Sequence, residues 1–433
     1  MAILTTAPRG TRDTLPRDAA KWQYVERSLL ETAALFGFRE IRTPIFEHTE
    51  LFLRSVGETT DVVNKEMYTF TDKGGRSITL RPEGTAGIAR AAIQNGLLAE
   101  ALPLKVSYLY RCFRYEKPQS GRFREFEQFG IELLGATAPD ADAEAIALVY
   151  EALQTLGLER VHVELNSIGC PQCRQRYHEA LRSFLDTKKE ALCATCQDRL
   201  EKNPMRVLDC KSPVCQEQVK DAPRMLDYLC QDCRDHFAQV QERLQDSDIP
   251  FCINPGIVRG LDYYTRTVFE LVYTYQSGQS LVCGGGGRYG GLLRELGGPD
   301  QEGVGFAMGV DRLLMVMEEE GCEFPPDPSC DVYLVSVGQR ATREAFRLAG
   351  ELRTQGFFAQ SDLMGRSVKA QMKYADKIGA KYTLVLGEDE LDKQQAALKS
   401  MGTGDTTTVP LGSGFGDAIY QQLLTAVSYS DQP

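Results

Sequence analysis

The sequence predicts an α+β fold in which an antiparallel sheet core, flanked by helices, contains a helical insertion and precedes an α/β domain. Three observations support this prediction. Short runs with period-two alternation lie between residues 68 and 132, which is typical of antiparallel hairpins. Residues 168–254 are rich in cysteine and poor in strand signals. After Pro325, Pro326 and Pro328, strand-like and helix-like runs alternate, which indicates a parallel or mixed sheet with helices on its faces.

The core elements follow in order along the chain. Residues 17–37 predict an amphipathic helix, because apolar residues from Trp22 to Phe36 recur every three or four positions. The domains are expected at 1–327 (core), 168–254 (insertion) and 331–425. The other predicted elements are a strand and turn at 38–44, strands in YTF, SITL, VSYLYRCF and EFEQFGIELLG, a helix at 140–156, strands at 256–275 and 280–283, and a helix at 308–320.

Composition limits the classes of protein. The chain has 433 residues, 42% apolar and 25% charged, which suits a globular protein of two or three domains. No apolar run approaches the length of a membrane span and the N-terminus has no signal-type apolar core, so we expect a cytoplasmic protein with no membrane partner. The net charge is −11. We therefore expect no DNA partner, and any RNA contact must use local basic patches.

Arginine recurs in the core beside glycine, glutamate and aromatic residues. Guanidinium groups grip phosphate or carboxylate through two parallel hydrogen bonds, so the set suits a bent triphosphate; the alternative is a group of unrelated surface arginines. Gly285–Gly290 fits the G-x-G-x-x-G pattern, but no βαβ unit surrounds it. A nucleotide enzyme built on an antiparallel sheet is the better interpretation. The arginines are Arg81, Arg111, Arg114, Arg122, Arg124, Arg259 and Arg312.

Five segments carry a more specific pattern: TPIFEHTELF with Pro44, YRCFRYEKPQSGRFREFEQFGIE, GVGFAMGVDRLL, RPEGTAGIAR (81–90) and RGLDYYTRTVFE (259–270). The first three resemble the three motifs of class II aminoacyl-tRNA synthetases, and the last two resemble the signatures of the histidyl-tRNA synthetase family. The resemblance covers nearly the whole chain. It implies a homodimer that uses ATP with Mg²⁺ to activate L-histidine and then charges the tRNA for histidine. The alternative is a non-catalytic relative that senses histidine as a regulatory subunit in histidine biosynthesis.

The same resemblance implies roles for ATP-site residues. Arg114 would hold the α-phosphate and Arg259 would lie opposite it, so these two are the expected catalytic residues. Such a site works by positioning and charge rather than by proton abstraction. In addition, Glu116 would bind the adenine amino group, Phe126 would stack on the purine, Arg122 and Arg312 would clamp the γ-phosphate, and Gln119 and Arg124 would contact tRNA.

Substrate histidine presents an ammonium group, a carboxylate and an imidazole, and the resemblance implies a partner for each. An imidazole needs partners on both nitrogens. Tyr263 is either part of this pocket or a packed aromatic. Gly284–Gly287 is one glycine longer than usual and Gly290 replaces a common aspartate, and both bear on the expected lid of the pocket. The implied partners are Glu83, Thr85 and Gln128 for the ammonium, Glu132 and Tyr264 for the ring, Tyr289 closing the pocket, and Arg114 and Arg259 near the carboxylate.

The C-terminal domain resembles the anticodon-binding domain of several class II synthetases. Lysines recur at every fourth position along one predicted helix, with only Asp376 to offset them. This stripe is either a solvated helix face or a track for tRNA phosphates. Its members are Lys369, Lys373, Lys377 and Lys381.

The cysteines of the insertion have the spacing of structural zinc sites. One expected set is Cys170, Cys173, Cys193 and Cys196, and the second is Cys210, Cys215, Cys230 and Cys233. The pairing is alternatively crosswise between the two sets, and reduced packing thiols are the alternative to zinc. The resemblance implies that this insertion contacts the acceptor arm of the tRNA.

Overall fold

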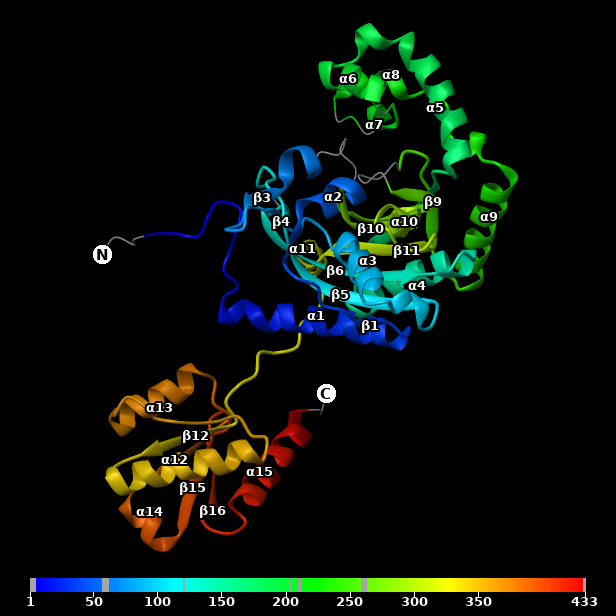
Figure 1. Ribbon diagram of the computed structural model, residues 1–433. Helices are drawn as coiled ribbons and strands as arrows, with labels where there is room; N and C mark the ends of the chain where they lie inside the picture. Colours follow the sequence, from blue (N-terminus) through cyan, green and yellow to red (C-terminus); the bar gives the residue numbers. More distant parts are fainter. Residues whose placement is uncertain are drawn as a thin grey trace. The chain divides into compact units, whose positions relative to one another are not determined.

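The computed structural model describes residues 5–56, 62–119, 121–202, 204–208, 210, 212–257 and 263–430 (Figure 1). The chain forms two compact units, residues 1–325 and 326–433. No helix in these described ranges is long and apolar enough to cross a membrane.

The larger unit is built on an eight-stranded sheet of order β1-β5-β6-β11-β10-β9-β7-β8. Its central strands run antiparallel, whereas β1 and β8 join the two edges in parallel. The predicted antiparallel core is confirmed. The strands are β1 (Arg39–Glu40), β5 (Leu104–Phe113), β6 (Glu125–Leu134), β7 (Val161–Ser167), β8 (Phe251–Ile253), β9 (Tyr264–Thr274), β10 (Ser280–Gly290) and β11 (Glu302–Gly309).

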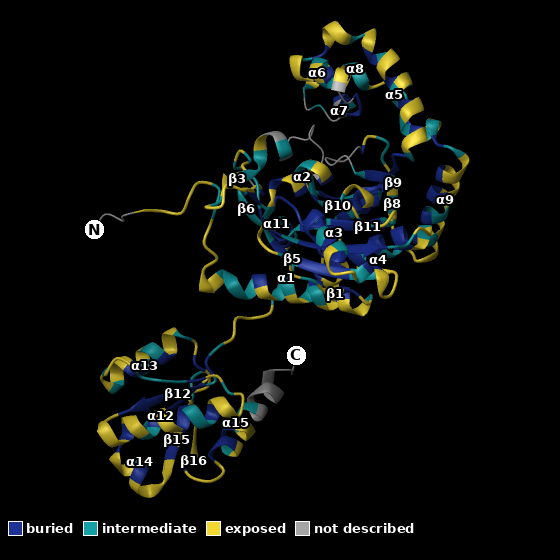
Figure 2. Ribbon diagram, viewed as in Figure 1, coloured by how far each residue is buried: buried dark blue, intermediate teal, exposed yellow. Residues whose placement is uncertain are grey.

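Four helices pack on one face of this sheet and enclose its largest apolar core. The predicted N-terminal helix is among them and buries Trp22 and Leu29. Successive side chains of a strand point to opposite faces, so Phe129, Ile131 and Leu133 of β6 join this core and the residues between them face the other way. Figure 2 shows the strands buried and the outer sides of the helices exposed. The helices are α1 (Pro16–Leu35), α4 (Pro139–Thr155), α9 (Gln231–Asp246) and α11 (Val310–Glu320).

The strand-like runs between residues 68 and 132 are antiparallel, as predicted, but they belong to two sheets. The first two runs form a separate three-stranded sheet of order β2-β4-β3. Alternation identifies a strand but not the strand with which it pairs. In this small sheet the Thr79 hydroxyl of β4 is hydrogen-bonded to the hydroxyl groups of Thr49, at 2.9 Å, and Thr69, at 2.8 Å. The elements here are β2 (Phe46–His48), β3 (Tyr68–Thr71), β4 (Ser77–Leu80), α2 (Thr49–Val56), η1 (Val62–Glu66), α3 (Thr85–Gln94), η2 (Leu97–Ala99) and α10 (Leu292–Glu295).

The insertion is helical, as predicted, but its last two elements, α9 and β8, pack into the core of the larger unit. Phe237, Val240 and Leu244 of α9 lie in the main apolar cluster, and β8 pairs with β7 at the sheet edge. The first part of the insertion stands away from the sheet (Figure 1). Its elements are α5 (Pro171–Asp186), η3 (Lys189–Ala191), α6 (Ala194–Lys202), α7 (Met205–Leu208), α8 (Pro213–Val219) and η4 (Met225–Tyr228).

The smaller unit has a mixed five-stranded sheet of order β13-β12-β14-β15-β16. The alternating strands and helices predicted after the prolines are all present, and the parallel pairs β12–β13 and β12–β14 confirm the expected topology. The elements are β12 (Val332–Ser336), α12 (Gln339–Thr354), β13 (Ala359–Ser361), α13 (Val368–Lys377), β14 (Tyr382–Leu386), α14 (Glu388–Lys393), β15 (Gln395–Ser400), β16 (Thr406–Pro410) and α15 (Phe415–Ser430).

Candidate functional site

A cavity of about 220 Å³ lies in the larger unit, where strands of the sheet meet the first turns of α3 and α11. Twelve of the residues expected to bind ATP or histidine line it. Arg259, the remaining one, lies outside the described residues. The twelve are Glu83, Thr85, Arg114, Glu116, Arg122, Phe126, Gln128, Glu132, Tyr263, Tyr264, Tyr289 and Arg312.

Glu132 is the most buried acid of this cavity, with 1% of the residue exposed. Its two carboxylate oxygens accept hydrogen bonds from the Thr85 hydroxyl and the Tyr289 hydroxyl, each at 2.6 Å. A Cβ on Gly305 would lie 2.1 Å from Glu132 Oε2, so only glycine leaves room for this carboxylate. Burial raises the pKa of Glu132 to about 8, although the two hydroxyl bonds oppose the rise.

Glu83 is fixed by the start of helix α3. Its carboxylate accepts the backbone N–H groups of Thr85 at 2.7 Å and Ala86 at 2.9 Å, which are donors left free at a helix N-terminus. Burial raises the pKa of Glu83, and these two backbone bonds oppose the rise. A second acid is thereby held rigidly in the same cavity.

Three tyrosines pack together at this end of the cavity. The Tyr263 ring lies 4.7 Å from that of Tyr264 and 5.6 Å from that of Tyr289, measured between centroids. Tyr263 therefore both packs against aromatics and lines the cavity. Phenol groups donate and accept hydrogen bonds, so this wall suits a polar aromatic ligand.

Gly284–Gly287, which we expected to bear on the lid of the pocket, lie within strand β10. They allow close approach of the neighbouring strands: a Cβ on Gly284 would lie 2.4 Å from Met308 Cβ, and one on Gly286 would lie 2.1 Å from Gly305 O. Gly284 and Gly285 line the cavity. The glycine run is thus part of the sheet beneath the site.

Three arginines line the other part of the cavity. Arg114 Nε donates to Pro82 O at 2.8 Å and Arg312 Nε donates to Gly121 O at 3.0 Å, which orients both guanidinium groups. Burial lowers the pKa of Arg312, and the charges of Arg122 and Arg114 lower it further. Glu116 lies 3.3 Å from Arg122 and 3.9 Å from Arg114. The surplus of positive charge favours a polyanionic ligand.

Sequence reasoning missed Arg288, which is fully buried beside Tyr289. Its Nε lies 3.0 Å from Asp142 Oδ2 of α4, and its Nη1 lies 2.8 Å from Glu302 Oε2 of β11. Burial opposes ionisation of Asp142, but hydrogen bonding from His236 and the charge of Arg288 hold its pKa below the ordinary value. The one signal in the sequence was an arginine directly after the four glycines that follow the predicted strand at 280–283, a position where a buried side chain of this type is expected to need a charged partner.

The expected tRNA residues fall in different places. Gln119 is exposed, whereas Arg124 Nε donates to Glu116 O at 3.2 Å and its guanidinium lies 3.8 Å from the Tyr115 ring centroid. Three lysines of the predicted stripe are exposed on α13, but Lys381 is not part of it. That helix ends at Lys377, and Lys381 Nζ pairs with Asp331 at 2.8 Å. The three on the helix are Lys369, Lys373 and Lys377.

The eight cysteines from Cys170 to Cys233 gather into two groups of four. The sequential pairing expected from their spacing is wrong, and the crosswise alternative is correct. Chain reversal between α5 and α9 brings the first CxxC pair against the last, which no spacing rule specifies. We name the clusters by their order along the chain, not by their position in space. The outer cluster is Cys170, Cys173, Cys230 and Cys233, and the inner cluster is Cys193, Cys196, Cys210 and Cys215. Within each, the sulfur atoms lie within 4.8 Å of one another, a separation that allows one metal ion to be shared.

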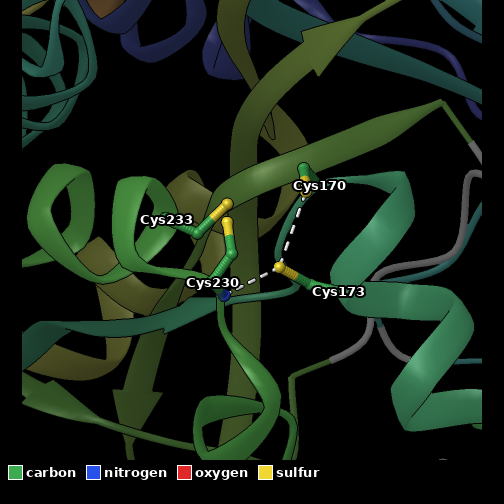
Figure 3. Close-up of side chains that lie close together, drawn as sticks. All are labelled: Cys170, Cys173, Cys230 and Cys233. Carbon is green, nitrogen blue, oxygen red and sulfur yellow. Dashed lines mark hydrogen bonds between the residues drawn. The ribbon is translucent and has the colours of Figure 1, made fainter.

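Backbone N–H groups point at sulfur in both clusters. Cys230 N donates to Cys173 Sγ at 3.0 Å in the outer cluster (Figure 3). Cys193 N donates to Cys215 Sγ at 3.2 Å in the inner one. Such donors stabilise thiolates, the form that binds metal.

Comparisons with known proteins give a consistent result. The family described as histidyl-tRNA synthetase matches residues 10–313, and the anticodon binding domain matches residues 331–415. A histidine–tRNA ligase of Clostridioides difficile is 52% identical over 95% of this chain and 98% of its own length. That of Clostridium perfringens is 51% identical over 94% and 97%. The crystal structure of apo Staphylococcus aureus histidyl-tRNA synthetase superposes with a TM-score of 0.83 at 40% identity, covering 96% of this chain and 100% of that one.

Proposed function

The chain belongs to the histidyl-tRNA synthetase family of class II aminoacyl-tRNA synthetases, and we propose that the 220 Å³ cavity binds both of its small substrates. The enzyme has histidine–tRNA ligase activity: it activates L-histidine with ATP and Mg²⁺ and transfers it to tRNA. A histidine carboxylate oxygen attacks the α-phosphorus, and the bond to the bridging oxygen breaks as pyrophosphate leaves. The tRNA hydroxyl then attacks the histidyl carbonyl carbon and AMP leaves.

The arginine part of the cavity binds the triphosphate in this proposal. Arg114 holds the α-phosphate, while Arg122 and Arg312 clamp the γ-phosphate. The support is that all three arginines line this cavity and that guanidinium groups match phosphate geometry. Phe126 stacks on the purine; the Arg114 guanidinium already lies 5.3 Å from its ring centroid. Glu116 accepts from the adenine amino group.

The tyrosine and glutamate part selects histidine, and this arrangement carries the proposal. Glu132 accepts from one ring nitrogen and Tyr264 bonds the other, while Tyr289 and Tyr263 enclose the ring. Glu83, Thr85 and Gln128 surround the ammonium group. The support is a buried carboxylate that two hydroxyl groups fix at 2.6 Å. A rigid hydrogen-bonding group of this kind discriminates strongly, because a ligand that cannot pair with it leaves a buried polar group without a partner.

Arg259 stabilises the α-phosphate from the side opposite Arg114 as the carboxylate attacks. This role rests on the segment RGLDYYTRTVFE, in which Tyr263 and Tyr264 follow Arg259 closely. The cavity wall formed by these two tyrosines is consistent with an arginine nearby in the chain. An interaction with the phosphate that becomes stronger in the transition state raises kcat rather than the affinity for the substrate.

The remaining partners are proposed as follows. Gln119, Arg124 and the exposed lysines of α13 contact the tRNA. The chain acts in the cytoplasm as a homodimer through α1 and the edge strand β1, where Leu35, Ile45 and Phe46 are exposed nearby. None of the thirteen cysteines forms a disulfide, in keeping with a reducing compartment. Sedimentation of a Phe46→Glu variant tests the dimer, and retention of the dimeric mass argues against this face.

Structural zinc in both cysteine clusters is the last part of the proposal. Four thiolates per site is a common zinc ligand set, and each cluster connects helices of the insertion and contributes two cysteines to its apolar core. Elemental analysis of protein purified without added metal should give two zinc ions per chain. Metal-free protein with all eight thiols titratable under native conditions refutes it.

Histidine-dependent ATP–pyrophosphate exchange tests the substrate sites directly. Purified protein should exchange pyrophosphate with L-histidine and with no other amino acid. A histidine-binding regulatory protein would bind histidine without exchange.

A further inference from the structure

The outer cysteine cluster lies between the first turns of two helices. Cys170 precedes α5 and Cys230 precedes α9, and in each case the second cysteine of the pair is one turn further on. Figure 3 shows the four side chains together where these helices begin. Free N–H groups at helix N-termini favour thiolates. The cluster therefore joins the two helices through which the insertion leaves and rejoins the core.

The residues just before this cluster hold a strained position on strand β9. Ile168 N donates to Arg266 O at 2.8 Å, and Arg266 N donates to Gly169 O at 2.9 Å. Arg266 has φ +53°, the left-handed region that non-glycine residues avoid. The register between β9 and β10 shifts at this point. The bulge on β9 thus depends on the chain segment that leads into Cys170.

Tyr264, two residues before the bulge, contacts the same region. It is buried in one apolar cluster with Ile168, Cys173 and Cys233. Arg174, the residue after Cys173, donates from Nη1 to Tyr264 O at 3.2 Å. The outer cluster therefore adjoins the backbone that presents Tyr264 to the cavity.

Cys196 and Cys215 of the inner cluster belong to the same apolar cluster, but in the described part of the chain the inner cluster has no hydrogen-bonded connection to β9 of this kind. The hydrogen bonds of its cysteines stay within the insertion, at Cys193, Cys215, Cys210 and Ser212. Helices α6, α7 and α8, which surround it, lie away from the sheet (Figure 1). The outer cluster is thus connected to strand β9 of the sheet, whereas the inner cluster connects helices within the insertion.

We propose that the outer cluster is a metal site that positions Tyr264, so that metal bound there controls the affinity for histidine. The inner cluster only stabilises the distal insertion. This inference rests on the proposed zinc sites and histidine pocket. A tetrahedral ion would fix the four sulfur atoms and, through Gly169 and Arg174, the β9 bulge and the Tyr264 backbone. Loss of the ion leaves the bulge free to relax and displaces the phenol group from the ring nitrogen.

The test compares matched cysteine variants in the full chain, Cys230→Ser in the outer cluster and Cys210→Ser in the inner one. Zinc is measured by elemental analysis, and the KM values for histidine and ATP by pyrophosphate exchange. Each variant should lose one zinc. Cys230→Ser should raise the histidine KM about tenfold, as expected for one lost hydrogen bond, with the ATP KM unchanged. Cys210→Ser should leave both KM values unchanged.

Arg174→Ala tests the connection without touching a metal ligand. It should keep both zinc ions and still raise the histidine KM more than the ATP KM. Zinc loss in Cys230→Ser with a normal histidine KM overturns the inference and leaves the zinc proposal standing. Wild-type protein without zinc overturns the zinc proposal itself. If Cys230→Ser does not fold, a normal histidine KM in Arg174→Ala still overturns the inference.

Discussion

Replacing Glu132 with glutamine tests the histidine pocket most directly. The shape is retained, but the side chain can no longer ionise and one acceptor becomes a donor. Both carboxylate oxygens already accept hydroxyl hydrogens at 2.6 Å, so the new amide N–H₂ group faces a hydroxyl that must rotate. Leaving a buried polar group without its hydrogen-bond partner costs about 1–3 kcal/mol. The histidine KM in pyrophosphate exchange should therefore rise roughly ten- to a hundredfold, with the ATP KM unchanged.

The same substitution has a predicted pH signature. The folded-state pKa of Glu132 is about 8, above an ordinary value of 4.5, so the stability it contributes is present below pH 4.5 and is lost as the pH rises through 8. Near pH 5 the free energy of unfolding of Glu132→Gln should equal that of the wild type or be lower. At pH 9 it should exceed that of the wild type, by at most about 5 kcal/mol. Urea unfolding at both pH values measures this difference.

Glu127→Gln is the matched control. Glu127 is also buried on β6, and burial raises its pKa to about 8 against the opposing charge of Arg111. It pairs with Arg111 at 2.8 Å and is not among the cavity-lining residues in the described part of the chain. Its replacement should leave the histidine KM unchanged. If Glu132→Gln raised the ATP KM as much as the histidine KM, or Glu127→Gln raised the histidine KM equally, the assignment would be wrong.

Four further outcomes are expected. Arg259→Ala should lower kcat of pyrophosphate exchange about 10²–10³-fold with little change in histidine KM, and a histidine-binding defect with normal exchange would contradict this. Gly305→Ala should weaken histidine binding measured by calorimetry, because its Cβ would lie 2.1 Å from Glu132 Oε2; unchanged affinity would count against the pocket. Asp142→Asn should cost about 3–5 kcal/mol in urea unfolding, since it leaves a buried guanidinium short of its partner. Lys373→Glu should weaken tRNA binding and flatten its salt dependence by about one phosphate contact, while exchange without tRNA stays normal.

Local patterns predicted most elements of both units. The apolar spacing in α1, the alternation in β5 and β6 and the alternating strands and helices after Pro325 depend on neighbouring residues along the chain. They therefore remain visible without any tertiary information. The same patterns gave no partner for the strands at 68–71 and 77–80, because a strand's partner is set by contacts distant in sequence.

The motifs identified twelve residues that line one cavity, because a motif is recognised by residue type and spacing. A carboxylate such as Glu132 or a guanidinium such as Arg312 is recognisable by its residue type and its motif. Arg288 was missed because its function is local: it neutralises Asp142 and Glu302 inside the fold, and a partner 146 residues away leaves no pattern in the sequence.

The sequence by itself determined which residues have metal-binding, phosphate-binding and imidazole-binding chemistry, since side-chain type sets that chemistry. Only the tertiary structure decided which of them meet. Cys170 and Cys230 lie far apart in the chain, yet α5 and α9 bring them together, and the glycine run 284–287 forms part of strand β10 beside the cavity. Long-range packing makes these choices, because burying the apolar faces of helices and strands fixes their relative positions.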